Sequence, residues 1–284
     1  MKKVLSLVLV ALMLVGTLAL TACGGASYKV GVQQGTTGWS YMSGDADWGF
    51  AGFTNIEVNP FENGGLAVRD MLNGNVDFVV IDDAPARQLV AANKGTKMID
   101  IALTTESYGI AVNKTDAALL ASINTILAEN QAEIDAIFAK YEDVNDDNAA
   151  EWAGEVITSA DYDSTKEQFV VATNAAFAPY EFKVGQNFAG IDMEIAKLVA
   201  DALGQELVIL DMEFDAIVSS VGKNGVDAGI AAMTINAKRK QSVNFADPYY
   251  SGAYQVIVCP EDCTLFDECE TTEDLVAVLN GLKK

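Results

Sequence analysis

Short apolar runs alternate along this chain with stretches of helical periodicity, and this alternation narrows the possible folds more than any other feature. The runs predict buried strands at 29–32, 76–81, 98–102, 108–112, 169–173, 207–210, 226–231 and 255–258. Between them, apolar residues repeat every three to four positions over 191–203, with Gly204 as a helix stop, and over 123–138. Strands that alternate with helices form mainly parallel sheets with helices on both faces. The sequence therefore predicts an α/β fold.

Two segments share one plan, LAVRDMLNGNVDFVVIDD at 66–83 and FDAIVSSVGKNGVDAGIAAMT at 214–234. Each contains an apolar-periodic helix, an Asn-Gly pair that ends it, and a Val-Asp pair that leads into a buried strand. A glycine just past the last helical turn is a common helix terminator. Two such units predict two lobes of similar architecture.

The N-terminus has the pattern of an export signal. Lys2 and Lys3 precede an almost wholly apolar stretch, which is followed by small residues, and we assign 1–22 as a signal peptide. The sequence LTAC at 20–23 resembles a bacterial lipobox, in which Cys23 is acylated and becomes the first residue. We therefore expect a lipid anchor on the outer face of the cell membrane. An ordinary signal peptide with an incidental cysteine is the alternative.

Composition argues against several classes of protein. The formal net charge of −22 disfavours nucleic acid as a partner, because nucleic acid is bound through basic surfaces. The chain has no histidine, so it lacks the Ser-His and Cys-His nucleophile pairs and the commonest zinc ligand. Neither a Gly-x-Ser-x-Gly elbow nor a Walker Gly-Lys-Ser/Thr pattern occurs. We predict no catalytic residues, no metal site and no cofactor.

Three polar stretches follow predicted strands, at the edge where open α/β sheets bind ligands. The GTTG loop at 35–38 follows the first predicted strand, Asp82 follows the second, and Arg239 lies beyond the seventh. We expect a carboxylate, a guanidinium and a turn rich in N–H groups to face one cleft.

Seven stretches carry a resemblance to a known family. They read GVQQGTTG, NGNVDFVVIDDAPA, ESYGIAVNK, VATNAAFAPYEF, GIDMEIAKLVADALG, FDAIVSSV and MTINAKRKQSVNFADPYY. Together they are similar to the polar amino acid substrate-binding proteins of bacterial ABC transporters, the extracellular solute-binding proteins of family 3. The resemblance implies a two-lobed, periplasmic-binding-protein-like (Venus-flytrap) fold and a monomeric extracytoplasmic receptor. Such a receptor binds a free amino acid between its lobes, delivers it to an ABC permease and is not an enzyme.

The order of these stretches differs from the order in the family. The half from FAPYEF to DPYY comes first in the family and the half with GTTG second, whereas here the halves are exchanged. The resemblance therefore implies a circular permutant, in which TTEDLVAVLNGLKK at the C-terminus would run directly into YKVGVQQGTTG. An acidic linker at 142–165, with eight acids and no Lys or Arg, would join the old termini. A short helix around Trp152 is expected within it.

The permutation predicts how the chain divides into lobes. One lobe is discontinuous, from 27–105 plus 253–284, and carries the GTTG loop. The other is continuous, at 106–252, and carries the acidic linker and the arginine. Two strands are expected to cross between the lobes, near 105–108 and 251–255. Two adjacent connections form a hinge about which lobes rotate over a ligand.

The resemblance also implies roles for individual residues. The carboxylate of an amino acid suits a bidentate arginine, and its ammonium needs a carboxylate. Arg239, five residues after Thr234, has the family's spacing for the carboxylate-binding arginine. The other implied contacts are a hydroxyl or N–H from Thr234, N–H groups from Thr36 and Thr37, the ammonium-binding Asp82, and aromatic flanks from Phe177 and Phe214.

Three positions favour a neutral ligand. Relatives that take cationic amino acids often have an acid where this chain has Asn174, and hydroxyl residues often stand where it has Ala231 and Ala232. We therefore expect a neutral amino acid, polar or modestly apolar, in contact with Ala232.

Each of these assignments has an alternative. Arg239 lies in the basic cluster AKRKQ and could be a surface charge, and Asp83 is a better helix cap than Asp82. Thr37 could cap the next helix, Phe177 and Phe214 could be core, and Trp39 could pack at the rim. For the whole chain, the alternatives are an enzyme on the same scaffold, such as a dehydratase acting on a small carboxylate, or a ligand-sensing module.

Cys259, Cys263 and Cys269 lie together in CPEDCTLFDEC. Cysteines of exported proteins usually pair, and three cysteines allow three different pairs. We expect one local disulfide and one remaining thiol. The spacing and the lack of histidine give little support to a zinc site.

Overall fold

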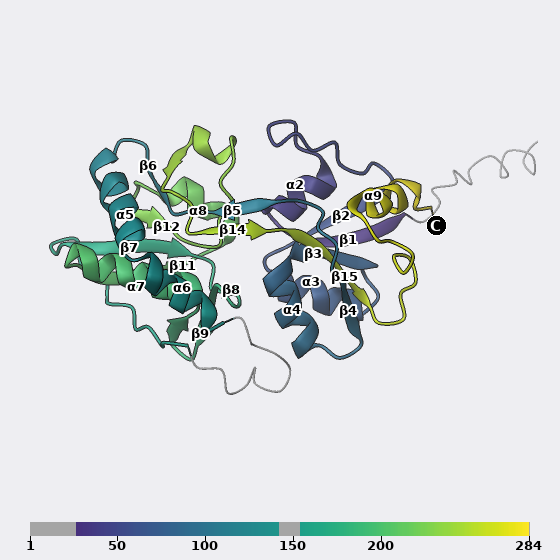
Figure 1. Ribbon diagram of the computed structural model, residues 1–284, viewed down its shortest axis with the longest axis horizontal. Helices are drawn as coiled ribbons and strands as arrows, with labels where there is room; N and C mark the ends of the chain where they lie inside the picture. Colours follow the sequence, from purple (N-terminus) through teal and green to yellow (C-terminus); the bar gives the residue numbers. More distant parts are fainter. Residues whose placement is uncertain (1–26, 142–153, 284) are drawn as a thin grey trace, which may run out of the picture.

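The computed structural model describes residues 27–141 and 154–283, so the signal peptide, Cys23 and Trp152 lie outside the described residues. Figure 1 shows two α/β lobes side by side, joined by two strands. Each lobe is built on a five-stranded sheet. Every helix in the described part of the chain is too short or too polar to cross a membrane.

The first lobe has the strand order β2-β1-β3-β15-β4. Its strands are β1 (Tyr28–Gln33), β2 (Ile56–Phe61), β3 (Phe78–Asp82), β4 (Thr96–Ile99) and β15 (Gln255–Pro260). Strand β1 pairs in parallel with β2 and β3, whereas β15 lies antiparallel between β3 and β4. Its helices are α2 (Thr37–Ser43), α3 (Gly64–Leu72), α4 (Asp83–Ala92) and α9 (Thr272–Gly281).

The second lobe has the strand order β11-β7-β12-β6-β13. Its strands are β6 (Ala111–Asn113), β7 (Gln168–Thr173), β11 (Glu206–Asp211), β12 (Ala228–Gly229) and β13 (Val243–Phe245). A small sheet adds β8 (Ala176–Phe177), β9 (Glu181–Val184) and β10 (Asn187–Ala189). The helices are α5 (Ala117–Glu129), α6 (Gln131–Ala139), α7 (Ile191–Leu203), α8 (Phe214–Ser220) and the 3₁₀ helix η1 (Arg239–Gln241).

The two five-stranded sheets have the same topology. In the first sheet, β1 lies between two parallel neighbours, and the antiparallel strand β15 lies between β3 and the edge strand β4. In the second sheet, β7 lies between two parallel neighbours, and the antiparallel strand β6 lies between β12 and the edge strand β13. The two similar segments found in the sequence occupy equivalent places, as α3 with β3 and as α8 with β12. The prediction of two α/β lobes of similar architecture is confirmed.

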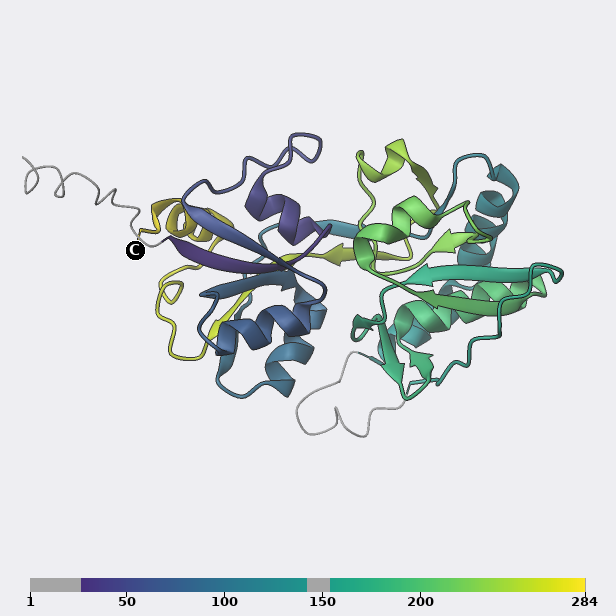
Figure 2. The same ribbon diagram turned by 180° about the vertical axis from the view of Figure 1, so that it is seen from behind.

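Alternating side chains bury both faces of the first sheet. In β3, Phe78 and Val80 pack with side chains of α2 and α9. Val79 and Ile81 point the other way and pack with side chains of α3 and α4. Successive residues of a strand face opposite sides, so a fully apolar strand requires helices on both faces. Figure 2 shows the two pairs of helices on opposite sides of this sheet.

Strands β5 (Glu106–Tyr108) and β14 (Tyr250–Ala253) pass between the lobes as an antiparallel ribbon. The predicted strand at 108–112 is therefore two strands, since the chain leaves the ribbon after Tyr108 and re-enters a sheet as β6. The predicted helix over 123–138 is also divided, because the side chain of Asn130 bonds the carbonyl of Ile126 and ends α5. Strand β2 was not predicted, since polar residues and Pro60 interrupt its apolar pattern.

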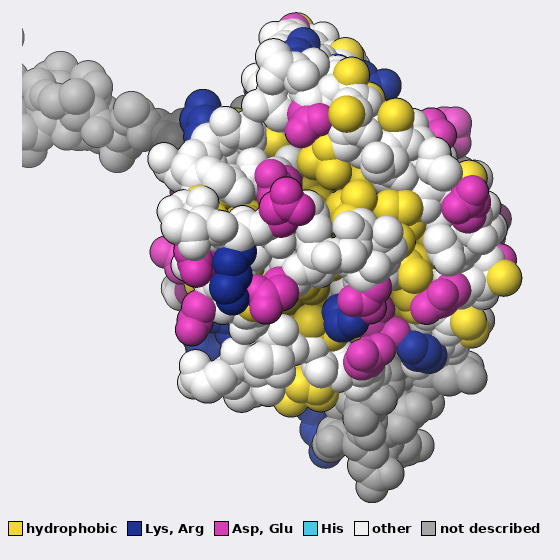
Figure 3. Space-filling model, turned by 90° about the vertical axis from the view of Figure 1, so that its left-hand side faces the viewer, with side chains coloured by type: hydrophobic (Ala, Val, Ile, Leu, Met, Phe, Trp, Pro, Cys, Tyr) yellow, Lys and Arg dark blue, Asp and Glu magenta, His cyan; other side chains and the backbone are white. Residues whose placement is uncertain are grey.

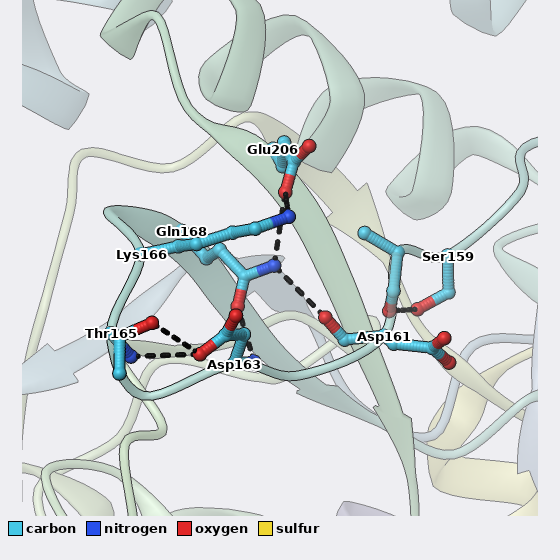
Figure 4. Close-up of polar contacts among 8 residues, drawn as sticks. Ser159, Asp161, Asp163, Thr165, Lys166, Gln168 and Glu206 are labelled. Carbon is cyan, nitrogen blue, oxygen red and sulfur yellow. Dashed lines mark hydrogen bonds and ion pairs between the residues drawn. The ribbon is translucent and has the colours of Figure 1, made fainter.

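The described part of the acidic linker, 154–165, is extended and contains no helix. The N–H of Ala160 donates to Leu207 O and that of Ile209 to Ser159 Oγ, so the segment follows the edge of β11. Figure 4 shows the turn that ends it, where Gln168 bonds the backbone of Asp161. Lys166 pairs with Glu206 at 3.1 Å beside it.

The three cysteines are free thiols, so the expected local disulfide is wrong. Cys259 lies on β15 with no exposed surface and packs within the core of the first lobe. Burial, with Cys263 beside it, raises the pKa of Cys259 to about 12. A buried protonated thiol packs as a small apolar side chain, which accounts for Cys259 without a covalent partner.

The acidic side chains at the outer end of the second lobe are dispersed over its surface. Figure 3 views the second lobe end-on and shows Asp and Glu side chains interspersed with Lys, Arg and apolar side chains. Several acids form surface ion pairs, such as Lys183 with Asp211 and Lys197 with Asp201. This distribution fits a solvated acidic surface.

Candidate functional site

A cavity lies between the lobes. Its lining residues are Gln33, Thr36, Thr37 and Asp82 of the first lobe and Asn174, Phe177, Glu181, Phe214, Ala231, Ala232, Thr234 and Arg239 of the second. The structure thus brings together all eight residues that the sequence analysis named for the site.

The topology explains why these residues meet. Thr36 follows β1, Asp82 is the last residue of β3, and Thr234 follows β12. The carboxyl ends of parallel strands share one edge of a sheet, and these edges of the two lobes face each other across the cavity.

Arg239 is the cationic centre of the site. It is 7% exposed, and its Nη1 donates to the carbonyl of Thr234 at 2.7 Å. Its Nη2 reaches across to the carbonyl of Gly35 in the first lobe at 3.0 Å. The rings of Phe214 and Trp48 lie 5.2 and 5.3 Å from its Cζ. Since a guanidinium has five N–H donors, donors remain for an anion in the cavity.

Arg239 keeps its charge despite this burial. Burial lowers its pKa to about 10, against the opposing effect of Glu106 and Asp82. The guanidinium is therefore protonated at neutral pH, and no other Lys or Arg is buried in the described ranges. A buried cation favours a bound anion, because an unpaired charge in a low dielectric is costly.

Asp82 is a carboxylate in the same cavity that could pair with a cation. It is buried, and the hydroxyl of Tyr108 donates to its Oδ1 at 2.5 Å. Burial, followed by the charge of Glu106, raises the pKa of Asp82 to about 7. A nearby cation would stabilise the charged form of this carboxylate.

The caps of two helices differ from expectation. Asp82 holds the N-cap position of α4, yet its side chain makes no cap bond, and Asp83 pairs with Arg87. The preference for Asp83 as the cap is therefore wrong, because Arg87 one turn on attracts its carboxylate. Thr36, not Thr37, caps α2, since its Oγ1 accepts from the N–H of Trp39.

Thr37 does not cap α2, and its hydroxyl instead donates a hydrogen bond to Glu106. Glu106 Oε2 accepts from Thr37 at 2.6 Å and from Thr234 at 2.5 Å. Its Oε1 accepts from Thr104 and Gln255. Thr37 and Thr234 come from opposite lobes, and their hydroxyl oxygens lie 3.0 Å apart. Glu106, on the ribbon between the lobes, thus fixes hydroxyl groups on both sides of the cavity.

A second acidic pair, Glu181 and Asp192, lies at the wall of the cavity, and Glu181 lines it. Asp192 Oδ2 accepts from the N–H of Ala232 at 2.6 Å and from Tyr249 at 2.9 Å. Burial, followed by the charge of its neighbour Asp192, raises the pKa of Glu181 well above its usual range. Among the described residues, no group of acids or cysteines is arranged to hold a metal ion.

Several contacts close the lobes over the cavity. Gln33 Nε2 donates to Asn174 Oδ1 at 2.8 Å across the gap, and both side chains are buried. Gly35, at φ +78°, lies so close to Asp215 that a Cβ there would stand 2.9 Å from the Asp215 Cβ. Only glycine suits this position, both for its backbone angle and for the approach of the second lobe.

Sequence reasoning did not assign Gln33, Glu106 or Glu181 to the site. Glu106 and Glu181 lie inside two quoted stretches, ESYGIAVNK and VATNAAFAPYEF, and Gln33 lies in GVQQGTTG. The signal was therefore present, but nothing local distinguished these residues from their neighbours. Trp39 does not line the cavity and instead lines a groove outside it with Trp48.

Part of this chain, which includes the second-lobe side of the cavity, is similar to a known family. Residues 169–281 match the bacterial extracellular solute-binding proteins, family 3. The arginine-binding extracellular protein ArtP of Bacillus subtilis is 33% identical over 95 residues, which are 34% of this chain and 37% of ArtP. A probable histidine-binding protein of Neisseria gonorrhoeae is 37% identical over 118 residues, which are 40% of this chain and 42% of that protein. The chain spans about two fifths of the length of these curated relatives.

A solved structure matches a similar share of the chain. The arginine-bound form of domain 1 from TmArgBP is 33% identical and has a TM-score of 0.30. The match covers 44% of this chain and 100% of that domain. The family match contains Asn174, Phe177 and Arg239, together with the other cavity residues of the second lobe.

Proposed function

Because this chain belongs, through residues 169–281, to the bacterial extracellular solute-binding proteins of family 3, we propose that it binds a free amino acid between its lobes. In this proposal it works outside the cytoplasm, hands the amino acid to an ABC permease, acts as a monomer and is not an enzyme. One observation carries the proposal: a buried arginine and a buried aspartate line the same small cavity. They match the two poles of a zwitterion.

The residues divide between these two poles. Arg239 would bind the α-carboxylate, with Thr36, Thr37 and Thr234 beside it. Asp82 would bind the α-ammonium, which explains why a carboxylate is retained in a buried place where its charged form is disfavoured. Phe177 and Phe214 would flank the side chain of the ligand, with Ala232 at the wall.

Calorimetry against the twenty protein amino acids tests this function. We expect saturable binding of one amino acid per chain, without chemical change of the ligand. Native mass spectrometry of freshly purified protein should show the same amino acid already bound. Absence of binding across the panel, or turnover of a small carboxylate, would contradict the proposal.

We propose a neutral polar ligand. Two buried amides without charge, those of Gln33 and Asn174, line the cavity. Glu181 also lines the cavity, where burial raises the pKa of its carboxyl well above its usual range and so disfavours its charged form.

Asn174→Asp is expected to shift the preference toward cationic amino acids. A carboxylate in the cavity attracts a positive side chain, so the affinity for arginine relative to glutamine should rise about tenfold. Competition calorimetry measures this ratio, with Asn174→Ser as the uncharged control. If the wild-type protein already prefers arginine to every neutral amino acid, the neutral assignment is wrong.

We also propose that the chain is a circular permutant with lobes at 27–105 plus 253–284 and at 106–252. The chain ends that flank 142–153 meet at Glu194, whose Oε1 accepts from Tyr141 Oη and from the N–H of Glu155. Figures 1 and 2 show the end of α9 beside the start of β1. Both junctions thus join neighbouring points, which a permutation requires.

A chain with the order of its halves restored tests the permutation. Residues 154–283, joined by a short Gly-Ser linker to 27–141, are expected to fold and to bind the same amino acid within about threefold of the original affinity. Circular dichroism and calorimetry measure the two properties. A chain that folds but has lost binding would count against the permutation.

We propose that acylated Cys23 anchors the protein to the outer face of the membrane. The relatives named as extracellular support an extracytoplasmic place. In bacterial cells, Cys23→Ser should release the protein from the membrane fraction, whereas a wild-type chain already found in the medium would contradict the anchor.

A further inference from the structure

The loop at 44–52, which joins α2 to β2, reaches from the first lobe to the arginine of the second. Asp45 Oδ2 lies 2.7 Å from Nζ of Lys238, and the ring of Trp48 lies 5.3 Å from Cζ of Arg239. Neither Asp45 nor Trp48 lines the cavity. The loop therefore touches Arg239 from outside the site that we propose for the ligand.

The loop has a defined internal structure. Asp45 and Phe50 exchange two backbone hydrogen bonds of 2.9 Å, and the N–H of Trp48 bonds Asp45 O. The N–H of Asp47 bonds the Asp45 side chain. The ring of Phe50 packs edge-on against Tyr41 of α2 at 5.2 Å. All of these contacts lie within the first lobe, so the conformation of the loop does not depend on the second lobe.

The contacts across the gap are electrostatic. The side chain of Asp45 is 11% exposed, so its ion pair with Lys238 is shielded from water on the acidic side. Nε1 of Trp48 is buried and has no hydrogen-bond partner within the described residues. The ring lies over the guanidinium of Arg239 and also packs against Phe50 of its own loop, with ring centroids 5.8 Å apart. A cation over an aromatic face is attracted most strongly when water is excluded.

We propose that the 44–52 loop acts as a clasp: its contacts with Arg239 and Lys238 stabilise the closed state and so lower the dissociation rate of a bound amino acid. The clasp rests on the proposed function, because it acts on the residue assigned to the ligand carboxylate. Trp48 is a positioning residue, since it contacts the arginine and not the cavity.

The clasp predicts a particular kinetic signature. Its contacts join the two lobes, so they exist only when the lobes are closed. Ligand enters before closure, and removal of the clasp should leave the association rate unchanged. Ligand leaves after opening, and removal should raise the dissociation rate. A residue with only a structural role would lower stability without separating the two rates.

Stopped-flow measurements on the whole exported chain test this, with the amino acid of the panel of twenty that the wild type binds most tightly. Trp48→Leu, which keeps apolar bulk without an aromatic face, should raise the dissociation rate about tenfold. Trp48→Phe should recover most of that loss. Asp45→Asn should raise the rate two- to threefold and weaken its dependence on salt.

Lys240→Ala is the matched control, because Lys240 is exposed one residue beyond the arginine. Equal dissociation rates in wild type and Trp48→Leu, with equal melting temperatures, would overturn the clasp and leave the proposed function standing. Slower association in Trp48→Phe and Trp48→Leu alike would also overturn it. Failure of the wild type to bind any amino acid would instead remove the proposed function, and the clasp with it.

Discussion

Arg239→Ala is expected to abolish amino acid binding. The variant leaves the ligand carboxylate in a buried cavity without its cation, and breaking one side of a buried charge pair costs about 3–5 kcal/mol. The affinity should fall at least about a hundredfold in calorimetry. Arg239→Lys should recover part of the loss, because lysine restores the charge without the planar fork of donors.

The fold should survive this change. The charge of Arg239 is itself costly to bury, and the bonds that it makes end on the carbonyls of Thr234 and Gly35. Circular dichroism should therefore be unchanged, and Lys240→Ala should bind as the wild type does. Wild-type affinity in Arg239→Ala would refute the role assigned to this residue.

Amino acid binding is expected to weaken as the pH falls below about 7. Without ligand, burial and the charge of Glu106 raise the pKa of Asp82 to about 7. The ligand ammonium needs the ionised form, which is abundant at pH 8 and scarce at pH 5. A free amino acid stays zwitterionic over this range, so the affinity should fall by up to about tenfold for each pH unit below 7.

Asp82→Asn separates this effect from other titrations. The variant should bind at least about a hundredfold more weakly at pH 8, and its remaining affinity should not change between pH 5 and 8. Asp192, whose pKa burial also raises to about 7, provides the control. Asp192→Asn keeps an oxygen for the N–H of Ala232, so it should retain the pH dependence. Wild-type binding that is flat from pH 5 to 8 would contradict the assignment of Asp82.

The prediction from sequence was strongest where one short segment encodes one element. The helix that ends at Gly204 and the strand from Phe169 to Thr173 match α7 and β7. Each depends on a local apolar period and a local stop. Thr36, Asp82 and Thr234 also share a simple rule, because each stands at or a few residues beyond the carboxyl end of a strand. Arg239 lies farther along the chain, and its assignment came from the spacing in the family resemblance.

Local choices between neighbours were the weakest predictions. Asp83 was preferred to Asp82 as a helix cap, yet its carboxylate pairs with Arg87. A disulfide was expected near Cys259, yet this side chain is a free thiol on β15 that packs in the core. In both cases two outcomes fit the same short sequence, and a neighbour brought in by folding selects one.

The sequence alone determined the two α/β lobes, because periodicity is a property of contiguous segments, and the family resemblance named eight of the residues along the cavity. Only the tertiary structure decided that Glu106 holds threonines of both lobes, that Gln33 meets Asn174 and that Trp48 covers Arg239. Gln33 and Asn174 are 141 positions apart, and such partners are chosen by how the lobes close. No local pattern encodes that closure, since it depends on shapes and charges that meet only after both lobes have formed.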